Sequence, residues 1–370
     1  MKTVRRMLYA DILKSVAFVA LAFLSLFFFF DFVAELARAD DKGYTAFHAA
    51  LYCLLLLPGH FYELAPIAVL IGGIYALASL AQSSEFTILR TGGLGPGRAL
   101  GLLAGLGLAF TVITFLVGDY LAPESETQAA AMKAVFRGGY NLGRAGAWLK
   151  DHRAAPEGER SYSVNVGSAS AAGDVQDVRI FEFDADGRLV RRIAAASGSV
   201  GKDSTWRLAD VTVTAWEDAT PGGAPQVRTE QLPTLSWPSA LSAEVVSAAV
   251  LPLSTMSTVN LFRYISHLAN NEQAAQRYEI QFWKRSLYPW ACLVMLALAL
   301  PFAYLHARTG GVSLKVFGGI MIGISFVLLN NVAGHIGLLR NYTPWIVASA
   351  PSVLYLLLAM GAFSWLVRYR

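Results

Sequence analysis

The sequence of 370 residues is 55% hydrophobic and only 15% charged, and its mean hydropathy is +0.45. These values exclude an ordinary soluble protein and indicate a membrane protein. The net charge is +4, but the basic residues are unevenly distributed along the chain, and we expect no nucleic-acid partner. Both cysteines, Cys53 and Cys292, lie in apolar runs. A disulfide framework and a thiolate metal site are therefore excluded.

The first apolar stretch follows Lys2, Arg5 and Arg6 and has the charge pattern of a signal peptide. It is longer than the apolar region of a signal peptide, and no small-residue cleavage site follows it. We therefore expect it to be retained as the first membrane span.

Six segments are long and apolar enough to cross a membrane as helices, which takes roughly 20 residues each. They are 12–36, 64–82, 99–118, 287–305, 316–334 and 344–367. Because burying a charge is costly, we expect the third span to end at Asp119. The apolar stretch 46–57 is too short to cross and precedes Pro58, so we expect an interfacial or broken half-helix there.

The distribution of Lys and Arg in short loops predicts the orientation, because these residues are retained on the cytoplasmic side during insertion. One side has ten of them and the other has three. The ten are Lys2, Arg5, Arg6, Lys14, Arg90, Arg98, Arg308, Lys315, Arg368 and Arg370, and the three are Arg38, Lys42 and Arg340. Both termini are therefore predicted to be cytoplasmic, and residues 119–286 are predicted to face outward.

The segment after Ala122-Pro123 changes to alternating polar and apolar positions, which indicates a soluble domain inserted between the third and fourth spans. A helix is expected over 124–138. Period-two runs then predict seven strands, at 147–150, 161–166, 178–184, 189–195, 206–208, 211–216 and 226–235. Seven short strands with turn signals between them are typical of a sandwich or jelly roll.

Two helices are predicted to return the chain to the membrane. Ser257 or Thr258 caps the first, which ends at Asn270-Asn271. Its apolar face consists of Leu261, Tyr264, Ile265 and Leu268. The second helix runs from Gln273 into the fourth span. The aromatic residues Trp283, Tyr288 and Trp290 beside Lys284 and Arg285 mark the membrane interface.

The expected architecture is therefore an α-helical membrane protein with six spans in a 3+3 arrangement and an inserted all-β domain. Its three parts are 1–122, 123–256 and 257–370. No motif of an ATPase, metalloprotease or serine hydrolase is present, and the run Gly92–Gly97 lacks the lysine of a phosphate-binding loop. The six histidines are dispersed without metal-ligand spacing. We therefore expect no catalytic residue, cofactor or metal in this chain.

Two groups of polar side chains lie within or close to the predicted spans. Asp31 follows the run Phe27–Phe30 near the outer end of the first span. It is either a helix end that reaches the interface or a contact to substrate or to a basic partner residue. Asn330-Asn331 in the fifth span are expected to form hydrogen bonds between helices.

A short amphipathic helix is predicted at about 82–92, between the second and third spans. Ser83 or Ser84 is a potential cap, Glu85 lies in the first turn, and Phe86 and Leu89 share one face. Such a helix is either a docking element for a cytosolic motor or an ordinary loop that leads back into the membrane.

Four segments together resemble the LptF/LptG family of lipopolysaccharide export permeases. They are Leu80–Glu85 continuing to Gly92-Gly93, Gly118–Pro123, Ala147–Asp151, and Arg277–Lys284 with Pro289. The resemblance runs the length of the chain, and the family has the same plan of three spans, a periplasmic β-jellyroll and three spans. The strand Trp148–Asp151 is more typical of the LptG branch than of the LptF branch.

The resemblance implies a permease subunit of an ABC-type transporter. It would pair with an LptF-like sister permease above a dimer of an LptB-type ATPase. The complex would extract lipopolysaccharide from the inner membrane and deliver it to LptC and the periplasmic bridge. Glu85 matches the acid of the family's coupling helix, and Lys133 matches a basic position near the lipid phosphates. Some relatives carry lysines where this chain has Asp31 and Gly59.

A large anionic lipid needs an apolar cavity with a basic rim. Phe27 and Phe30 are candidates for contacting the acyl chains, next to Asp31. The candidates for the phosphates are Arg38, Lys42, Lys133 and Arg137, the last two being four residues apart on one helical face. The candidates for coupling to the ATPase are Glu85, Phe86, Leu89 and Arg90. ATP-driven closure would act through Glu85 and collapse the cavity, which pushes lipid toward the jellyroll.

Two other functions remain open from the sequence. One is a membrane-anchored periplasmic scaffold or sensor that transports nothing, and the other is the permease of a different lipid or lipoprotein exporter.

Overall fold

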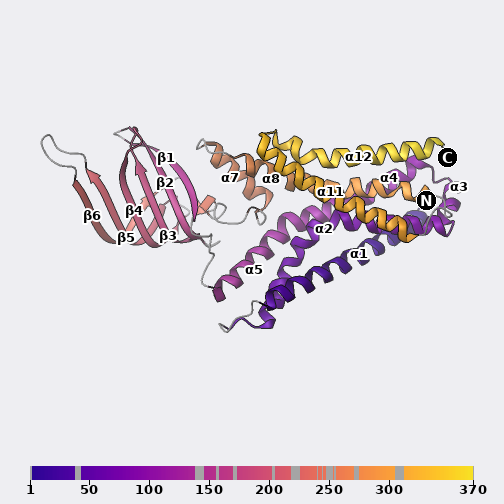
Figure 1. Ribbon diagram of the computed structural model, residues 1–370, viewed down its shortest axis with the longest axis horizontal. Helices are drawn as coiled ribbons and strands as arrows, with labels where there is room; N and C mark the ends of the chain where they lie inside the picture. Colours follow the sequence, from indigo (N-terminus) through magenta and orange to yellow (C-terminus); the bar gives the residue numbers. More distant parts are fainter. Residues whose placement is uncertain are drawn as a thin grey trace. The chain divides into compact units, whose positions relative to one another are not determined.

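The computed structural model divides the chain into two compact units (Figure 1). The first consists of Met1–Ala129 with Glu279–Arg370, and the second is Ala130–Tyr278. The described residues are 2–37, 43–137, 146–155, 158–169, 173–201, 205–217, 226–239, 241–243, 245–246, 253, 256–270, 275–304 and 312–369.

The first unit is a helical bundle. The helices before the inserted domain are α1 (Lys2–Leu36), α2 (Ala46–Gln82), α3 (Glu85–Thr91), α4 (Pro96–Leu116), the π-helix η1 (Val117–Leu121) and α5 (Ala122–Arg137), which continues into the second unit. Those after it are α8 (Gln276–Leu287), η3 (Tyr288–Trp290), α9 (Ala291–Ala299), α10 (Pro301–Tyr304), α11 (Val312–Arg340) and α12 (Pro344–Tyr369). Both chain ends and α3 lie at the same end of this bundle (Figure 1).

Six helical segments in the described chain are long and apolar enough to cross a membrane, which confirms the six predicted spans. They are Thr3–Leu36, Ala46–Gln82, Pro96–Lys133, Gln276–Tyr304, Val312–Arg340 and Pro344–Trp365. In the most apolar 18 residues of each span, 78% of the residues are buried in the second span, but only 11% in the first and 22% in the fifth. A helix that is apolar all round and buried belongs at the centre of a bundle. The first and fifth spans instead present most of their apolar surface outward.

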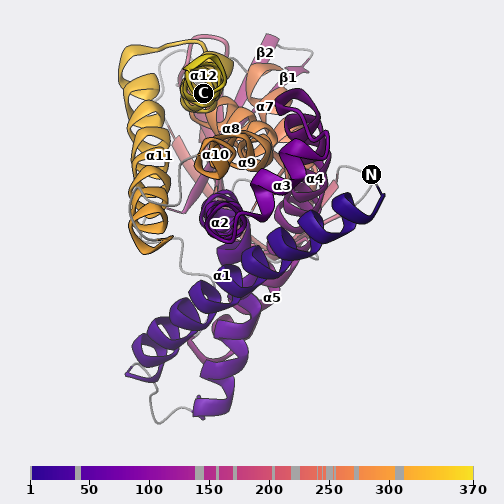
Figure 2. The same cartoon turned by 90° about the vertical axis from the view of Figure 1, so that its right-hand side faces the viewer.

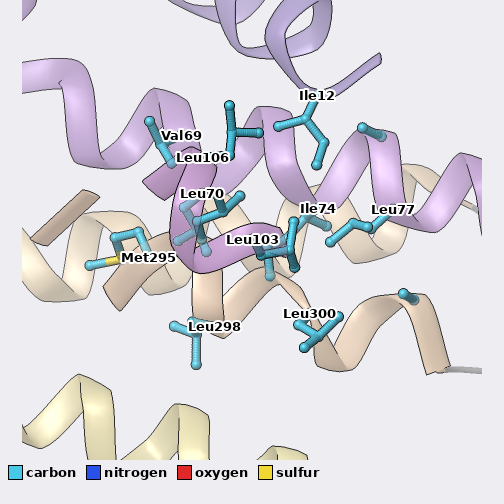
Figure 3. Close-up of a cluster of buried hydrophobic side chains, with 14 of the residues drawn as sticks. Ile12, Val69, Leu70, Ile74, Leu77, Leu103, Leu106, Met295, Leu298 and Leu300 are labelled. Carbon is cyan, nitrogen blue, oxygen red and sulfur yellow. The ribbon is translucent and has the colours of Figure 1, made fainter. Parts of the chain in front are cut away.

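The centre of the bundle is formed by α2 and α9, which lie side by side with α4 next to them (Figure 2). Leucines and isoleucines of these helices interlock in one buried cluster (Figure 3). Its fully buried members include Leu70, Ile74 and Leu77 of α2 and Leu103 of α4. The spans before and after the inserted domain therefore share one core.

The second span continues as one helix through Pro58, from Ala46 to Gln82. The expected break into an interfacial or broken half-helix over 46–57 is therefore wrong. A proline removes one hydrogen bond from a helix, but an apolar environment offers no water to satisfy an opened backbone. Continuing the helix leaves fewer backbone groups without partners than breaking it.

The third span also continues where a boundary was expected. It passes through Asp119 as the π-helix η1 and goes on into α5. The side chain of Asp119 is only 5% exposed, and its Oδ1 lies 3.8 Å from Nε of Arg285. The charge of Asp119 does not interrupt the helix, because a cation from the fourth span compensates it. π-Helical turns are rare and are frequent at functional sites.

The Arg285 node consists of Tyr62, Gly118, Asp119 and Arg285. The Arg285 guanidinium donates a hydrogen bond to the carbonyl of Gly118, and the Tyr62 hydroxyl donates one to the carbonyl of Arg285 at 3.2 Å. Any side chain at position 118 would overlap the Tyr62 ring, so a glycine is required there. The node joins α2, η1 and α8, which belong to the second, third and fourth spans.

The second unit contains one antiparallel sheet with its strands in chain order. The strands are β1 (Ala147–Ala155), β2 (Gly158–Ala169), β3 (Asp174–Phe183), β4 (Leu189–Val200), β5 (Thr205–Glu217) and β6 (Gln226–Pro238). An inserted all-β domain is thus confirmed. The two runs expected at 206–208 and 211–216 form the single strand β5, which passes through Asp210 at φ 53°. The described strands form a meander, and the Greek-key connections of a jelly roll are not seen among them.

One face of the sheet is buried, as the alternating pattern predicts. Its most buried side chains include Val164, Ile180 and Trp206, and the Trp206 indole donates a hydrogen bond to the carbonyl of Leu241 at 3.0 Å. The helix α7 (Thr258–Asn270) has the predicted limits and apolar face. Ser257 is its cap, because the Ser257 hydroxyl oxygen accepts a hydrogen bond from the amide of Asn260 at 3.2 Å.

His267 of α7 lies next to β1. Burial lowers the pKa of His267 below its ordinary value, against the opposing effects of the Asp151 carboxylate and of a hydrogen bond to the Lys150 backbone. Asp151 is itself buried and accepts a hydrogen bond of 2.8 Å from the Ser239 hydroxyl. His267 is therefore neutral in the folded domain at neutral pH.

Removing one partner of the Arg285–Asp119 pair should destabilise the bundle. Asp119→Leu leaves an uncompensated buried cation, which costs about 3–5 kcal/mol. The double variant Asp119→Leu, Arg285→Met removes both charges and should recover most of that loss. Thermal unfolding of the purified protein in detergent measures both effects. A single variant as stable as the double variant would contradict the pairing.

Acid should loosen the contact between α7 and β1. The pKa of His267 is lower in the folded state than in the unfolded state, where it is about 6.5. Its neutral form therefore supports folding above that pH, and this support is lost as the pH falls through the folded pKa. Hydrogen exchange of α7 amides, corrected for intrinsic rates, should show opening that increases from pH 7 to pH 5. The same dependence in His267→Gln would contradict this origin, and His152→Gln, an exposed position of β1, is the control.

Candidate functional site

The helix α3 is attached to the bundle by the face that carries Phe86. Phe86 is 2% exposed, and its ring packs edge-to-face on Tyr304 of α10 at 5.2 Å between centroids. The Arg90 guanidinium lies 4.9 Å from the centroid of the same Tyr304 ring. Leu89 packs against the bundle core. Three of the four predicted coupling residues therefore hold α3 against the fourth span.

Glu85 is exposed, as is Arg90, whereas Phe86 is buried and Leu89 is half-buried. Ser84 precedes it in a left-handed conformation, with φ 63°, and makes no hydrogen bond of its side chain to the helix start. Glu85 borders a cavity of about 330 Å3 that is also lined by Asp11 and Lys14 of α1. A partner that docks against Glu85 therefore also meets charged groups of the first span.

Asp31 is paired within the chain. Its Oδ2 lies 2.7 Å from Nε2 of His60 in α2, and both side chains are partly exposed. The ring of Phe27 stacks on His60 at 5.1 Å between centroids, whereas Phe30 is exposed. Of the residues predicted to contact substrate, the structure thus brings Phe27 and Asp31 together on one histidine.

The predicted basic rim is described only in part. Arg38 and Lys42 lie outside the described residues. Lys133 is half-buried on α5, and α5 includes position 137, so Lys133 and Arg137 are four residues apart on one helix, as predicted. Both belong to the second unit.

A second cavity, of about 250 Å3, lies between α2, α8, η3 and α11. It is lined by Tyr62, Glu63, Gln281, Lys284, Arg285, Tyr288, Val327, Asn330 and Asn331. The Lys284 ammonium donates a hydrogen bond of 2.9 Å to the Asn330 carbonyl. We call this hollow the Lys284 cavity.

The Lys284 cavity was missed by the sequence analysis, which assigned Lys284 and Arg285 only to the membrane interface. Neighbouring residues of a helix point about 100° apart, so two adjacent basic residues can face different surroundings. The structure places Arg285 inward against Asp119 and Lys284 into the cavity. Two adjacent bases just before an apolar span were the signal that one of them is buried.

No group of three or more metal-binding side chains in the described part of the chain is arranged to hold an ion. The polar groups that the bundle exposes are instead single charges and amides beside apolar surface. Such an arrangement suits the binding of an amphipathic molecule and the docking of a protein partner.

Comparison with known proteins assigns the chain to a family over almost its full length. The family described as "Lipopolysaccharide export system permease LptF/LptG" matches residues 6–368. The lipopolysaccharide export system permease protein LptG of Escherichia coli strain K12 is 24% identical over 332 residues, which cover 89% of each chain. The protein of the same name from Haemophilus influenzae is 24% identical over 360 residues, which cover 96% of each chain. The chain therefore belongs to the LptF/LptG family of lipopolysaccharide export permeases.

Proposed function

We propose that this chain is a permease subunit of an ATP-driven exporter that extracts lipopolysaccharide from the inner membrane and passes it to a periplasmic carrier. The observation that carries the proposal is the family match over residues 6–368, together with six spans and an inserted β-domain. The match covers 89% of the length of the Escherichia coli relative and 96% of the length of the Haemophilus influenzae relative.

The proposed orientation places the chain ends and α3 in the cytoplasm and the β-domain in the periplasm. Ten basic residues in short loops on one side against three on the other support it. The chain ends and α3 lie at one end of the bundle, in agreement with a single cytoplasmic face (Figure 1).

The proposed partners are an LptF-like sister permease, a dimer of an LptB-type ATPase beneath α3, and LptC at the receiving side. ATP hydrolysis then belongs to the cytosolic partner. Large apolar side chains such as Phe18, Leu21 and Leu314 are exposed on α1 and α11, and these faces would meet lipid or the sister permease within the membrane.

Coupling to the ATPase is proposed to run through α3. Glu85 would contact the motor, while Phe86 and Arg90 transmit the displacement to Tyr304 at the end of the fourth span. The tight packing of Phe86 supports this division of roles, since a helix held only by loops would move without displacing its neighbours. The substrate's acyl chains would lie against Phe27 and Phe30, and its phosphates against Lys133 and Arg137.

Glu85→Lys should uncouple ATP hydrolysis from lipid release. Reversing a charge in a docking contact removes an attraction and adds a repulsion, and a loss of 1.4 kcal/mol already lowers affinity about tenfold. We expect at least a tenfold drop in ATP-dependent lipopolysaccharide release from the reconstituted complex. Thr87→Lys is the matched control, because it adds a cation at another exposed position of α3. Normal ATP-dependent release by the Glu85→Lys complex would refute the assignment.

The double variant Lys133→Glu, Arg137→Glu should weaken contact with the lipid phosphates. Two cations four residues apart on one helix become two anions, which repel a phosphate. Photo-cross-linking of lipopolysaccharide from a benzoylphenylalanine at the exposed position 30 should fall several-fold. Gln128→Glu, at another exposed position of α5, controls for a general effect of negative charge. Unaltered cross-linking in the double variant would remove both residues from the lipid site.

A further inference from the structure

The Lys284 cavity holds a cation that no described carboxylate compensates. Lys284 is half-buried, its one hydrogen bond goes to the Asn330 carbonyl, and no acidic oxygen of the described residues lies within 4.0 Å of its ammonium. Glu63 lines the same cavity at its exposed side but makes no ion pair with Lys284. A partly buried ammonium without a counter-ion is costly, and an anionic ligand would remove that cost.

Arg285, the neighbouring cation, does not need a ligand as its counter-ion. Arg285 faces Asp119, with 3.8 Å between Nε and Oδ1, and donates to the Gly118 carbonyl. Its charge is therefore compensated inside the bundle. The two adjacent bases thus have separate roles, Arg285 in the packing of the spans and Lys284 in the cavity.

The lining also contains neutral hydrogen-bond donors, in addition to the paired Arg285 and the exposed Glu63. Gln281, Asn330 and Asn331 each carry a side-chain amide with two N–H groups. The Tyr288 hydroxyl is engaged, because it donates to the carbonyl of Glu63 at 2.5 Å. An ammonium with neutral amides beside it suits the oxygens of a single phosphate group.

The cavity is shaped around the Lys284 side chain. Gly334 of α11 is buried directly beside the Lys284 ammonium, and a side chain at position 334 would overlap it. The glycine therefore keeps open the place that the ammonium occupies. This provides a way to displace the cation without changing its charge.

The position of the cavity indicates a lipid headgroup as the source of the phosphate. Three lining residues, Lys284, Arg285 and Tyr288, lie in the sequence between Trp283 and Trp290, whose rings are exposed. Exposed tryptophans are enriched at the level of lipid headgroups. With about 250 Å3, the cavity is smaller than the roughly 300–1,000 Å3 of pockets that enclose a whole small molecule. It therefore accommodates one polar group of a larger molecule.

We infer that the Lys284 cavity is a phosphate subsite for an anionic lipid, with Lys284 as the cation and Gln281, Asn330 and Asn331 as neutral donors. The inference rests on the proposed function in taking lipopolysaccharide as the lipid. The site is distinct from the rim predicted at Lys133 and Arg137, because it lies between α2, α8 and α11 of the bundle.

The test uses the whole exporter complex with a benzoylphenylalanine at the exposed position 332, next to the cavity lining, in nanodiscs that contain lipopolysaccharide. Lys284→Gln removes the positive charge. Gly334→Ala displaces the ammonium from its place but leaves its charge unchanged. Both should lower the yield of lipid cross-linking at least fivefold in complexes that elute as single species in size-exclusion chromatography. Arg340→Gln, an exposed base on α11 outside the cavity lining, should leave the yield unchanged. Unchanged yields in both cavity variants would overturn the proposal.

Three further arms distinguish the sources of the phosphate. Enzymatically dephosphorylated lipopolysaccharide should cross-link at least fivefold less than the intact lipid, and an equal yield would overturn the proposal. Cross-linking of phosphatidylglycerol in a Lys284-dependent manner, with none of lipopolysaccharide, would retain the phosphate subsite and contradict the proposed export function. Displacement of the lipid by excess inorganic phosphate would overturn the assignment to a lipid headgroup.

Discussion

The buried ion pair between Arg285 and Asp119 constrains the rest of the bundle. Its two residues belong to the third and fourth spans, which the inserted β-domain separates in the sequence. Bringing two charges out of water is costly, and the attraction between them offsets this only when both are in place. The pair therefore requires that the spans before and after the β-domain pack together, and the shared core of α2, α4 and α9 joins the same spans.

The same fourth span connects the two ends of the bundle. At one end, Tyr304 contacts Phe86 and Arg90 of α3. At the other, Arg285 and Lys284 belong to the node and to the cavity. Residues 276–304 form the successive helices α8, η3, α9 and α10, with a turn at Leu300 between α9 and α10. In the proposed exporter, this span would connect α3 with the polar groups at the other end of the bundle.

Hydropathy and alternation predicted most of the architecture because both report burial directly. The six spans and the buried face of the sheet were found in this way, and so was α7 with its Ser257 cap. What was missed depends on pairing across the chain. Asp119 was expected only to bound the third span, since a local pattern cannot show that Arg285 compensates its charge. Pro58 was expected to break a helix for a similar reason, because its surroundings decide whether a lost hydrogen bond opens the backbone.

Among the site residues, local sequence found the exposed acid Glu85 but could not separate the two sides of α3. Phe86 was grouped with it for motor contact, whereas burial against Tyr304 makes Phe86 the anchor. Lys284 was overlooked because a base beside aromatic residues is common at membrane interfaces. Its cavity depends on Gly334 and Asn330 of another span, which no spacing within α8 reveals.

The central claim is that this chain carries lipopolysaccharide as part of an ATP-driven complex. Native mass spectrometry of the complex, purified from membranes together with its cytosolic ATPase, tests it most directly. The account predicts that lipopolysaccharide is bound and that its occupancy falls when ATP is added. A complex that contains only bulk phospholipid, or that purifies without any ATPase, would contradict it.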